Sequence, residues 1–200
     1  MKPLTLEELT APDLFAELRD DHFEQHVKYL DRCRRVRIGP AVTMVFENRQ
    51  TLWFRVQELV RVARLTDERR VQAELTWYNR LLPKRNQLQA AVWVAEPGRR
   101  PGRSLDAVRQ AVSLGRIGFR SACGDEVPGM CLTDRVGDRL IGLAQWYEFH
   151  FTASDRDAFA DYGRRWWLFV EGAGYQHDGL PLEPEVHESL LADLEESDEE

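Results

Sequence analysis

Residues 34–83 read RRVRIGPAVTMVFENRQTLWFRVQELVRVARLTDERRVQAELTWYNRLLP, and their hydrophobic period changes partway along. Apolar and polar residues alternate over 36–46, which predicts a bent strand or a hairpin of two short strands around the Gly-Pro pair. Asn48 is a favourable helix N-cap, and the spacing that follows it predicts a helix over 49–64. A second helix is predicted from residue 66 until a proline stops it after residue 82.

The helix predicted over 49–64 carries more polar residues than its own packing requires. Its apolar stripe comprises Leu52, Val56, Leu59, Val60 and Ala63. Thr51, Phe54, Glu58 and Arg61 fall on the opposite side, with Gln57 at the edge. Glu58 and Arg61 are three residues apart and can form an ion pair. Glu47, Asn48 and Arg49 begin the helix, where unpaired N–H groups and the helix dipole favour an anion.

These polar residues allow two kinds of interpretation. The first is a polar pocket that binds a carboxylate or phosphate ligand, or an enzyme site in which Glu47 or Glu58 is a general base between Arg61 and Tyr78. The second is a helix sandwiched between the N-terminal helix and the sheet, whose buried polar groups are satisfied by their neighbours.

The segments on either side predict an α+β protein. A short capped segment is expected over residues 3–11 and a helix over 13–33, with Leu14, Leu18, His22, Tyr29 and Cys33 on one side. Strands are expected at 88–94, 117–123, 128–133, 140–152, 165–171 and 175–182, and helices at 105–114, 154–162 (capped by Ser154) and after 184. Because helices come first and strands follow, N-terminal helices should pack against a C-terminal, mostly antiparallel sheet.

The same pattern predicts a single domain over residues 1–194. It consists of a helical part (3–83), a β-rich part (88–182) and a C-terminal helix (184–194), followed by an acidic disordered tail (195–200). A loop rich in Pro, Gly and Arg at 96–103 is the only segment that suggests a boundary.

Composition indicates a folded cytoplasmic protein. The 200 residues are 43% hydrophobic and 10% aromatic. Neither an apolar run of about 20 residues nor a signal-peptide core is found in the sequence, so no membrane association is expected. Cys33, Cys123 and Cys131 are odd in number and widely spaced, which is typical of reduced thiols.

The net charge of −7 comes from the C-terminus. Residues 183–200 contain nine of the 34 acids and no Lys or Arg, so 25 acids face 27 basic residues in the rest of the chain. A body with a net charge near +2 argues against nucleic acid as a partner. The basic clusters at Arg32–Arg37 and at Arg99, Arg100 and Arg103 are interpreted as solvated arginines.

A helical histidine pair gives a metal-binding alternative. His22 and His26 are four residues apart on the first long helix, a spacing at which two imidazoles can hold one metal ion. Cys33 lies about 16 Å further along that helix, so a third ligand such as Glu74 or His150 would have to come from another segment. No other cofactor is predicted.

Aromatic residues gather on the later strands. Trp146 and Phe149 fall on opposite faces of one strand, so both faces of the sheet need cover. A homodimer or burial by the N-terminal helices would supply that cover.

A pattern of residues over 34–83 resembles a known family. It comprises Arg35, Arg37 and Gly39, then Phe46-Glu47-Asn48-Arg49 with Thr51, Gln57-Glu58, Arg61, Glu74-Leu75, Tyr78-Asn79 and Leu81-Leu82-Pro83. These residues resemble the bacterial family catalogued as domain of unknown function 3501, and weaker similarity continues through 140–151 and the C-terminal helix. Several of them, including Thr51, Glu58 and Arg61, lie on the polar helix face.

The resemblance implies a role beside a redox or peroxide-defence system. Genes of the family often neighbour those of rubrerythrin-like and iron–sulfur proteins, which makes such a protein the expected partner. The expected function is therefore a non-catalytic accessory protein that binds a ligand or partner. The candidate ligand-binding residues are Glu47, Asn48, Arg49, Thr51, Gln57, Glu58, Arg61, Tyr78 and Asn79.

Overall fold

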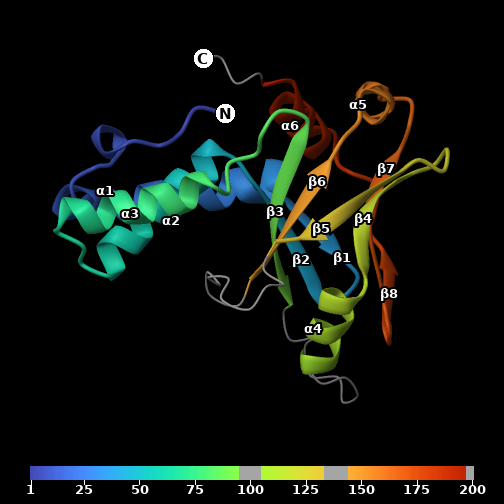
Figure 1. Ribbon diagram of the computed structural model, residues 1–200, viewed down its shortest axis with the longest axis horizontal. Helices are drawn as coiled ribbons and strands as arrows, with labels where there is room; N and C mark the ends of the chain where they lie inside the picture. Colours follow the sequence, from blue (N-terminus) through green and yellow to red (C-terminus); the bar gives the residue numbers. More distant parts are fainter. Residues whose placement is uncertain (95–104, 133–143, 197–200) are drawn as a thin grey trace.

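The computed structural model describes residues 1–94, 105–132 and 144–196. Within them, six α-helices and an eight-stranded antiparallel sheet confirm the predicted α+β class (Figure 1). The loop at 96–103 with its arginines, the beginning of the strand predicted at 140–152 and the last four residues of the acidic tail lie outside the described residues.

The helices and strands lie close to the positions expected from the sequence. The helices are α1 (Pro12–Tyr29), α2 (Arg49–Val62), α3 (Glu68–Asn79), α4 (Leu105–Leu114), α5 (Ala153–Ala160) and α6 (Pro184–Glu195), with a 3-10 turn η1 (Leu6–Glu8) and a π turn η2 (Leu30–Arg34). The strands are β1 (Arg35–Ile38), β2 (Val42–Glu47), β3 (Gln87–Val94), β4 (Arg116–Ser121), β5 (Glu126–Cys131), β6 (Gln145–His150), β7 (Trp166–Gly172) and β8 (Tyr175–Asp178). Their order in the sheet is β1-β2-β3-β6-β5-β4-β7-β8.

The sheet curls until its two edges meet. The Tyr175 hydroxyl on β8 donates to the Ile38 carbonyl at the end of β1 (2.6 Å) and accepts from the Ala41 N–H (3.1 Å). Gly39, at φ 64°, makes this approach feasible, since a Cβ atom there would lie 2.5 Å from the His177 ring. The curled sheet is therefore closed where the hairpin of β1 and β2 meets β8.

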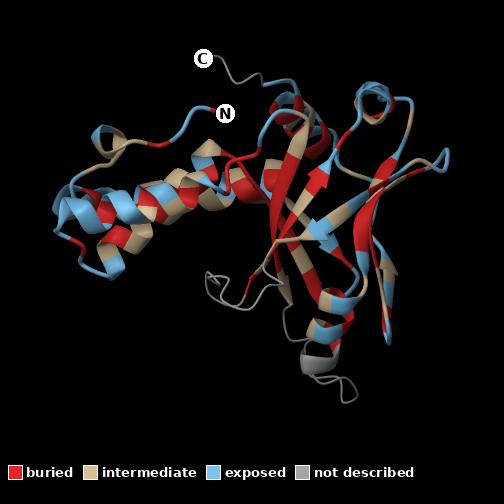
Figure 2. Cartoon of the chain, viewed as in Figure 1, coloured by how far each residue is buried: buried red, intermediate tan, exposed pale blue. Residues whose placement is uncertain are grey.

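The inside of the curled sheet is the larger hydrophobic core. Phe119 is at its centre, with ring centroids of Phe149 and Phe159 at 5.1 and 5.8 Å. Buried residues of α4 and α6 belong to the same core, and these helices lie at opposite ends of the sheet in Figure 1. Figure 2 shows the buried positions following the strands and the inward sides of these helices.

Helices α1–α3 project to one side of the sheet, and α2 and α3 form a second core with the N-terminal segment against its outer face. Trp146 of β6 is buried among residues of α2 and α3, whereas Phe149 points into the first core. The two residues thus lie on opposite faces, as strand alternation predicts. Within the single chain, the N-terminal helices supply the cover that the outer face needs.

Local structure differs from the sequence expectations in three places. Leu14 and Leu18 were expected in the core but are 50% and 41% exposed, because α1 packs on α2 through Phe15 instead. The helix predicted over 13–33 ends in the π turn η2. Helix α5 is capped by Thr152 rather than Ser154, since Thr152 and Asp155 form a reciprocal capping box.

Two findings concern the chain as far as the structure describes it. None of its helices has the length and apolarity needed to cross a membrane. Cys33, Cys123 and Cys131 form no disulfide within the described residues.

Candidate functional site

A buried cluster of polar residues begins at the N-terminus of α2. Asn48 caps the helix by accepting from the Thr51 N–H at 3.1 Å, and the Thr51 hydroxyl donates to Glu47 at 2.6 Å. Arg55 donates two hydrogen bonds to the other Glu47 oxygen, at 3.0 and 2.6 Å. Glu47 is fully buried, and both of its oxygens accept hydrogen bonds from α2. The predicted anion position at this helix start is therefore filled by the protein's own side chains.

The cluster continues to the C-terminal helix. The Tyr29 hydroxyl accepts from the Asn48 amide (2.8 Å) and from Arg34 Nε (2.7 Å). Arg34 forms a bidentate ion pair with Asp193 of α6, and both side chains are almost fully buried. We call the connected set the buried polar chain: Arg55, Glu47, Thr51, Asn48, Tyr29, Arg34 and Asp193. It ties α1, α2 and α6 to the sheet.

Three other candidate residues hold the N-terminal segment. Arg49 donates to the Lys2 carbonyl at 3.0 Å and pairs with Glu8. The Asn79 amide exchanges two hydrogen bonds with the Leu4 backbone, at 2.8 and 2.9 Å. The Gln57 amide faces the Thr10 backbone. These side chains are used to fasten residues 2–10 over α2 and α3.

Glu58 and Arg61 form the ion pair expected from their spacing. Arg61 donates to both Glu58 oxygens, at 3.0 and 2.9 Å, and Arg19 of α1 donates at 3.2 Å. The hydrogen bonds from Arg61 and Arg19 lower the pKa of Glu58 although its partial burial opposes them. A carboxylate held in this way is a weak proton acceptor at neutral pH.

An open pocket of about 660 Å³ lies between α1, α2 and the outer face of the sheet, and we call it the α1–α2 pocket. Its apolar lining comprises Phe23, Val27, Leu30, Val45, Phe54, Leu59, Val62 and Trp93. Its polar lining comprises His26, Arg35, Thr43, Arg55, Glu58 and Tyr78. Of the nine candidate ligand-binding residues, the structure places only Glu58 and Tyr78 here.

His26 is one of the polar groups that line this pocket. Its ring stacks on Phe54, with 4.1 Å between centroids, and makes no hydrogen bond to any residue that the structure describes. Burial, together with the nearby Arg55 and Arg35 guanidinium groups, lowers the pKa of His26 to about 4. The imidazole is therefore neutral at physiological pH, with ring nitrogens that can bond to a ligand.

The two histidines of the metal alternative lie in different surroundings. His22 packs between Phe15 and Trp53, at 5.6 and 5.5 Å between ring centroids, while His26 lines the pocket. In the described ranges, no three His, Cys, Asp or Glu side chains are grouped as a metal site requires. The structure adds no third ligand to the predicted pair.

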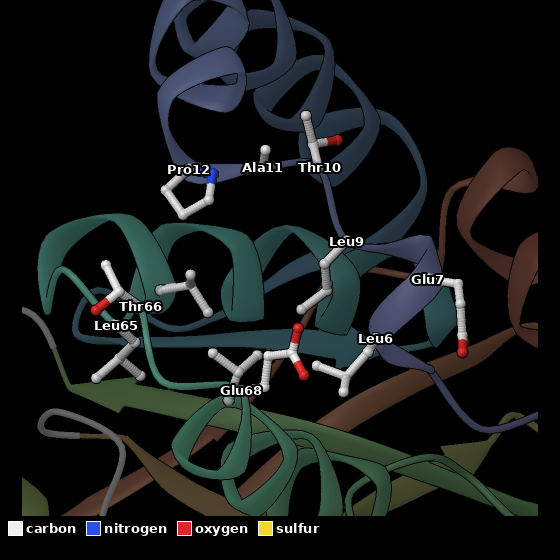
Figure 3. Close-up of a pocket in the computed structure, with 11 residues that line it drawn as sticks. Leu6, Glu7, Leu9, Thr10, Ala11, Pro12, Leu65, Thr66 and Glu68 are labelled. Carbon is white, nitrogen blue, oxygen red and sulfur yellow. The ribbon is translucent and has the colours of Figure 1, made fainter.

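A second pocket, of about 560 Å³, lies beneath the N-terminal segment. Figure 3 shows Leu6 and Leu9 reaching from that segment toward Glu68 of α3, with Glu7 at the edge. Its ionisable lining residues are the two acids, and the rest of its wall is mainly aliphatic. Fewer kinds of polar contact are available here than in the α1–α2 pocket, which is therefore the stronger candidate site.

Sequence reasoning missed Arg55, Tyr29, Arg34 and Asp193. Arg55 follows Thr51 by four residues, so helical spacing alone could have placed it beside Glu47. Asp193 falls among the apolar positions of α6, next to the buried Leu194, which signals an acid directed inward. No local signal identifies Arg34 as its partner, because 159 residues separate the two.

The geometry describes a small α+β protein with a curled antiparallel sheet, a projecting helical layer and an amphipathic pocket between them. The chain belongs to the family described as "Protein of unknown function (DUF3501)", whose model matches residues 3–194. This match confirms the resemblance inferred from residues 34–83 and extends it over nearly the whole sequence.

Comparison with solved structures supports the fold. The chain is similar to a protein of unknown function from Burkholderia pseudomallei K96243, with a TM-score of 0.82 and 22% identity. The alignment covers 96% of this chain and all of the other. The comparison with curated proteins finds no match.

Proposed function

We propose that the protein binds a small amphipathic molecule in the α1–α2 pocket and acts as a ligand-binding accessory protein. The observation that carries this proposal is a pocket of about 660 Å³ with mostly apolar walls and a few convergent polar groups, including His26 without a hydrogen-bond partner among the described residues. Pockets of a few hundred Å³ with this composition are the usual form of small-molecule sites.

The surroundings of the two candidate bases favour binding over catalysis. A general base at neutral pH needs an accessible carboxylate with a raised pKa. Glu47 is fully buried and bonded to Thr51 and Arg55, and the pKa of Glu58 is lowered by Arg61 and Arg19. The enzyme alternative built on Glu47 or Glu58 therefore has less support than ligand binding.

The test is calorimetric titration with two probes of the same chain length, decan-1-ol and decanoate. The wild type should bind at least one of them saturably. Val27→Trp places a larger side chain in the pocket and should abolish this binding, whereas Leu18→Trp, on an exposed part of the same helix, should preserve it. No saturable binding of either probe by the wild type, or unchanged binding by Val27→Trp, would contradict the proposal.

The expected partner and the expected cellular location remain predictions that belong to this proposal. Family resemblance supports a rubrerythrin-like or iron–sulfur protein as the partner, in the bacterial cytoplasm. Phe23 and Val62, which line the pocket and are 43% and 68% exposed, offer an apolar surface beside its opening for such a partner or for a homodimer.

A further inference from the structure

We infer that the ligand of the α1–α2 pocket is a carboxylate with an apolar body, and that its anionic group is held by Arg35 and Arg55 beside His26 and Thr43. The inference rests on the proposed function and specifies the ligand's class. It is carried by hydrogen-bonding groups that the protein leaves unused in one part of the pocket.

Both arginine side chains have N–H donors that no described residue accepts. Arg55 uses Nε and Nη2 for Glu47, which leaves Nη1 without a partner among the described residues. The Arg55 guanidinium lies 5.0 Å from the Trp93 ring centroid, so cation–π contact and the Glu47 bonds fix its position. Arg35 uses Nη1 for Asp31, and its other side-chain nitrogens have no described partner. Planar guanidinium groups of this kind match the geometry of a carboxylate.

The charges around His26 come from three neighbouring elements. Arg55 and Glu58 line the pocket from α2, Arg35 lines it from β1, and Tyr78 lines it from α3. Glu58 is already neutralised by Arg61 and Arg19. Glu47 is buried behind Arg55 and does not line the pocket. Arg35 and Arg55 are each paired with one carboxylate, Asp31 and Glu47, and both keep further N–H donors that can bind an anion.

The rest of the lining fits an apolar body. Phe23, Phe54 and Trp93 supply aromatic surface, and Val27, Leu30 and Leu59 supply aliphatic surface around the same space. Burying such a body contributes roughly 0.8 kcal/mol per CH₂ group, so a chain of several carbons adds substantial affinity to the contacts of the charged group. A purely polar anion would lack this contribution.

Binding of the anion should be coupled to protonation of His26. A negative charge placed beside the imidazole stabilises its protonated form, so the pKa of His26 in the complex should rise above the value of about 4 in the free protein. Because the complex then binds more protons than the free protein, the affinity should increase as the pH falls toward 5.5.

The first experiment compares decanoate with decan-1-ol by calorimetry at pH 7. Loss of one charge-assisted hydrogen bond costs about 10-fold in affinity, so decanoate should bind roughly 10-fold or more tightly than decanol. Arg35→Gln should remove most of that preference. Arg32→Gln is the matched control, because Arg32 is an exposed neighbour outside the pocket.

The second experiment uses decane-1-sulfonate, which does not titrate between pH 5.5 and 7.5. Its affinity for the wild type should rise on acidification, and this dependence should disappear in His26→Gln.

The outcomes separate the two proposals. Equal binding of decanol and decanoate, or an unchanged preference in Arg35→Gln, overturns the anion site and leaves the pocket as a binding site for neutral molecules. Failure of both probes to bind overturns the proposed function together with the anion site.

Discussion

Two polar regions of helix α2 lie within two turns of each other and differ in how their hydrogen bonds are used. The side chains of Asn48 and Thr51 each accept a hydrogen bond from the other residue's backbone N–H and are almost inaccessible to solvent. Around Arg55, in the α1–α2 pocket, donors and an imidazole remain without partners. The comparison shows that the number of polar residues on a helix does not identify a site. The proposed site is inferred from the unused hydrogen-bonding groups instead.

The largest expected effect is a loss of stability when the Asp193 carboxylate is removed from the buried polar chain. Asp193→Ala leaves the Arg34 guanidinium buried without its ionic partner, which typically costs about 3–5 kcal/mol. Urea unfolding should show this as a lower midpoint. Glu185→Ala is the control, since its pair with Arg32 is exposed and spans 3.9 Å. An equal loss of stability in both variants would contradict a structural role for the buried polar chain.

Glu47→Gln should affect the two regions in opposite directions. Replacing the buried carboxylate removes the charge that Arg55 and Thr51 bond to and should lower the free energy of unfolding by about 2 kcal/mol. Arg55 would then carry an uncompensated positive charge, so decanoate should bind at least as tightly as in the wild type. Weaker decanoate binding by a folded Glu47→Gln protein would mean that Glu47 itself belongs to the ligand site.

The pocket should also contribute to acid sensitivity. The pKa of His26 is about 4 in the folded protein, against about 6.5 in the unfolded chain, so the unfolded state binds more protons between these values. The free energy of unfolding should therefore fall as the pH drops from 6.5 to 4.

The His26→Gln substitution should reduce this dependence of the free energy of unfolding on pH, as measured by urea unfolding at pH 7 and pH 4.5. The buried His187, whose pKa is also lowered by burial, contributes a slope of the same sign and remains in the variant. Identical slopes in the wild type and His26→Gln would show that His26 is not shielded from solvent.

The smallest effect is expected for Arg61→Ala. Arg61 pairs with Glu58 at the protein surface, where such pairs contribute little to stability. Arg19 still bonds to Glu58 in the variant, and Arg61 does not line the pocket. Thermal unfolding and decanoate titration should both stay close to the wild type. A large loss of binding would restore the polar helix face as the site.

The sequence predicts the fold well where the signals are local. Asn48 caps α2, the Gly-Pro pair turns the hairpin of β1 and β2, and the apolar period locates α2 and α3. Thr51, Glu58 and Arg61 were also correctly recognised as residues outside the apolar stripe. The Glu58–Arg61 pair followed from its spacing, whereas the bond from Arg19 to Glu58 did not, because Arg19 comes from another helix.

The pocket was missed for a related reason. Its lining comes from α1, α2, α3 and three strands, and no stretch of sequence contains more than a part of it. His26 was noticed only as one half of a metal-binding pair. Its importance depends on its distance from Arg35 and Arg55 and on its burial, which are properties of the packed helices.

The most direct test of the account is to map decanoate binding by amide and indole chemical shifts in nuclear magnetic resonance spectra of the wild type. We expect saturable shifts at the Trp93 indole and at the amides of Val27 and Thr43, all from residues that line the pocket, with little change at the Trp167 indole of β7, which does not line it. Shifts confined to residues 47–51, or uniform small shifts without saturation, would contradict the assignment of the α1–α2 pocket as the ligand site.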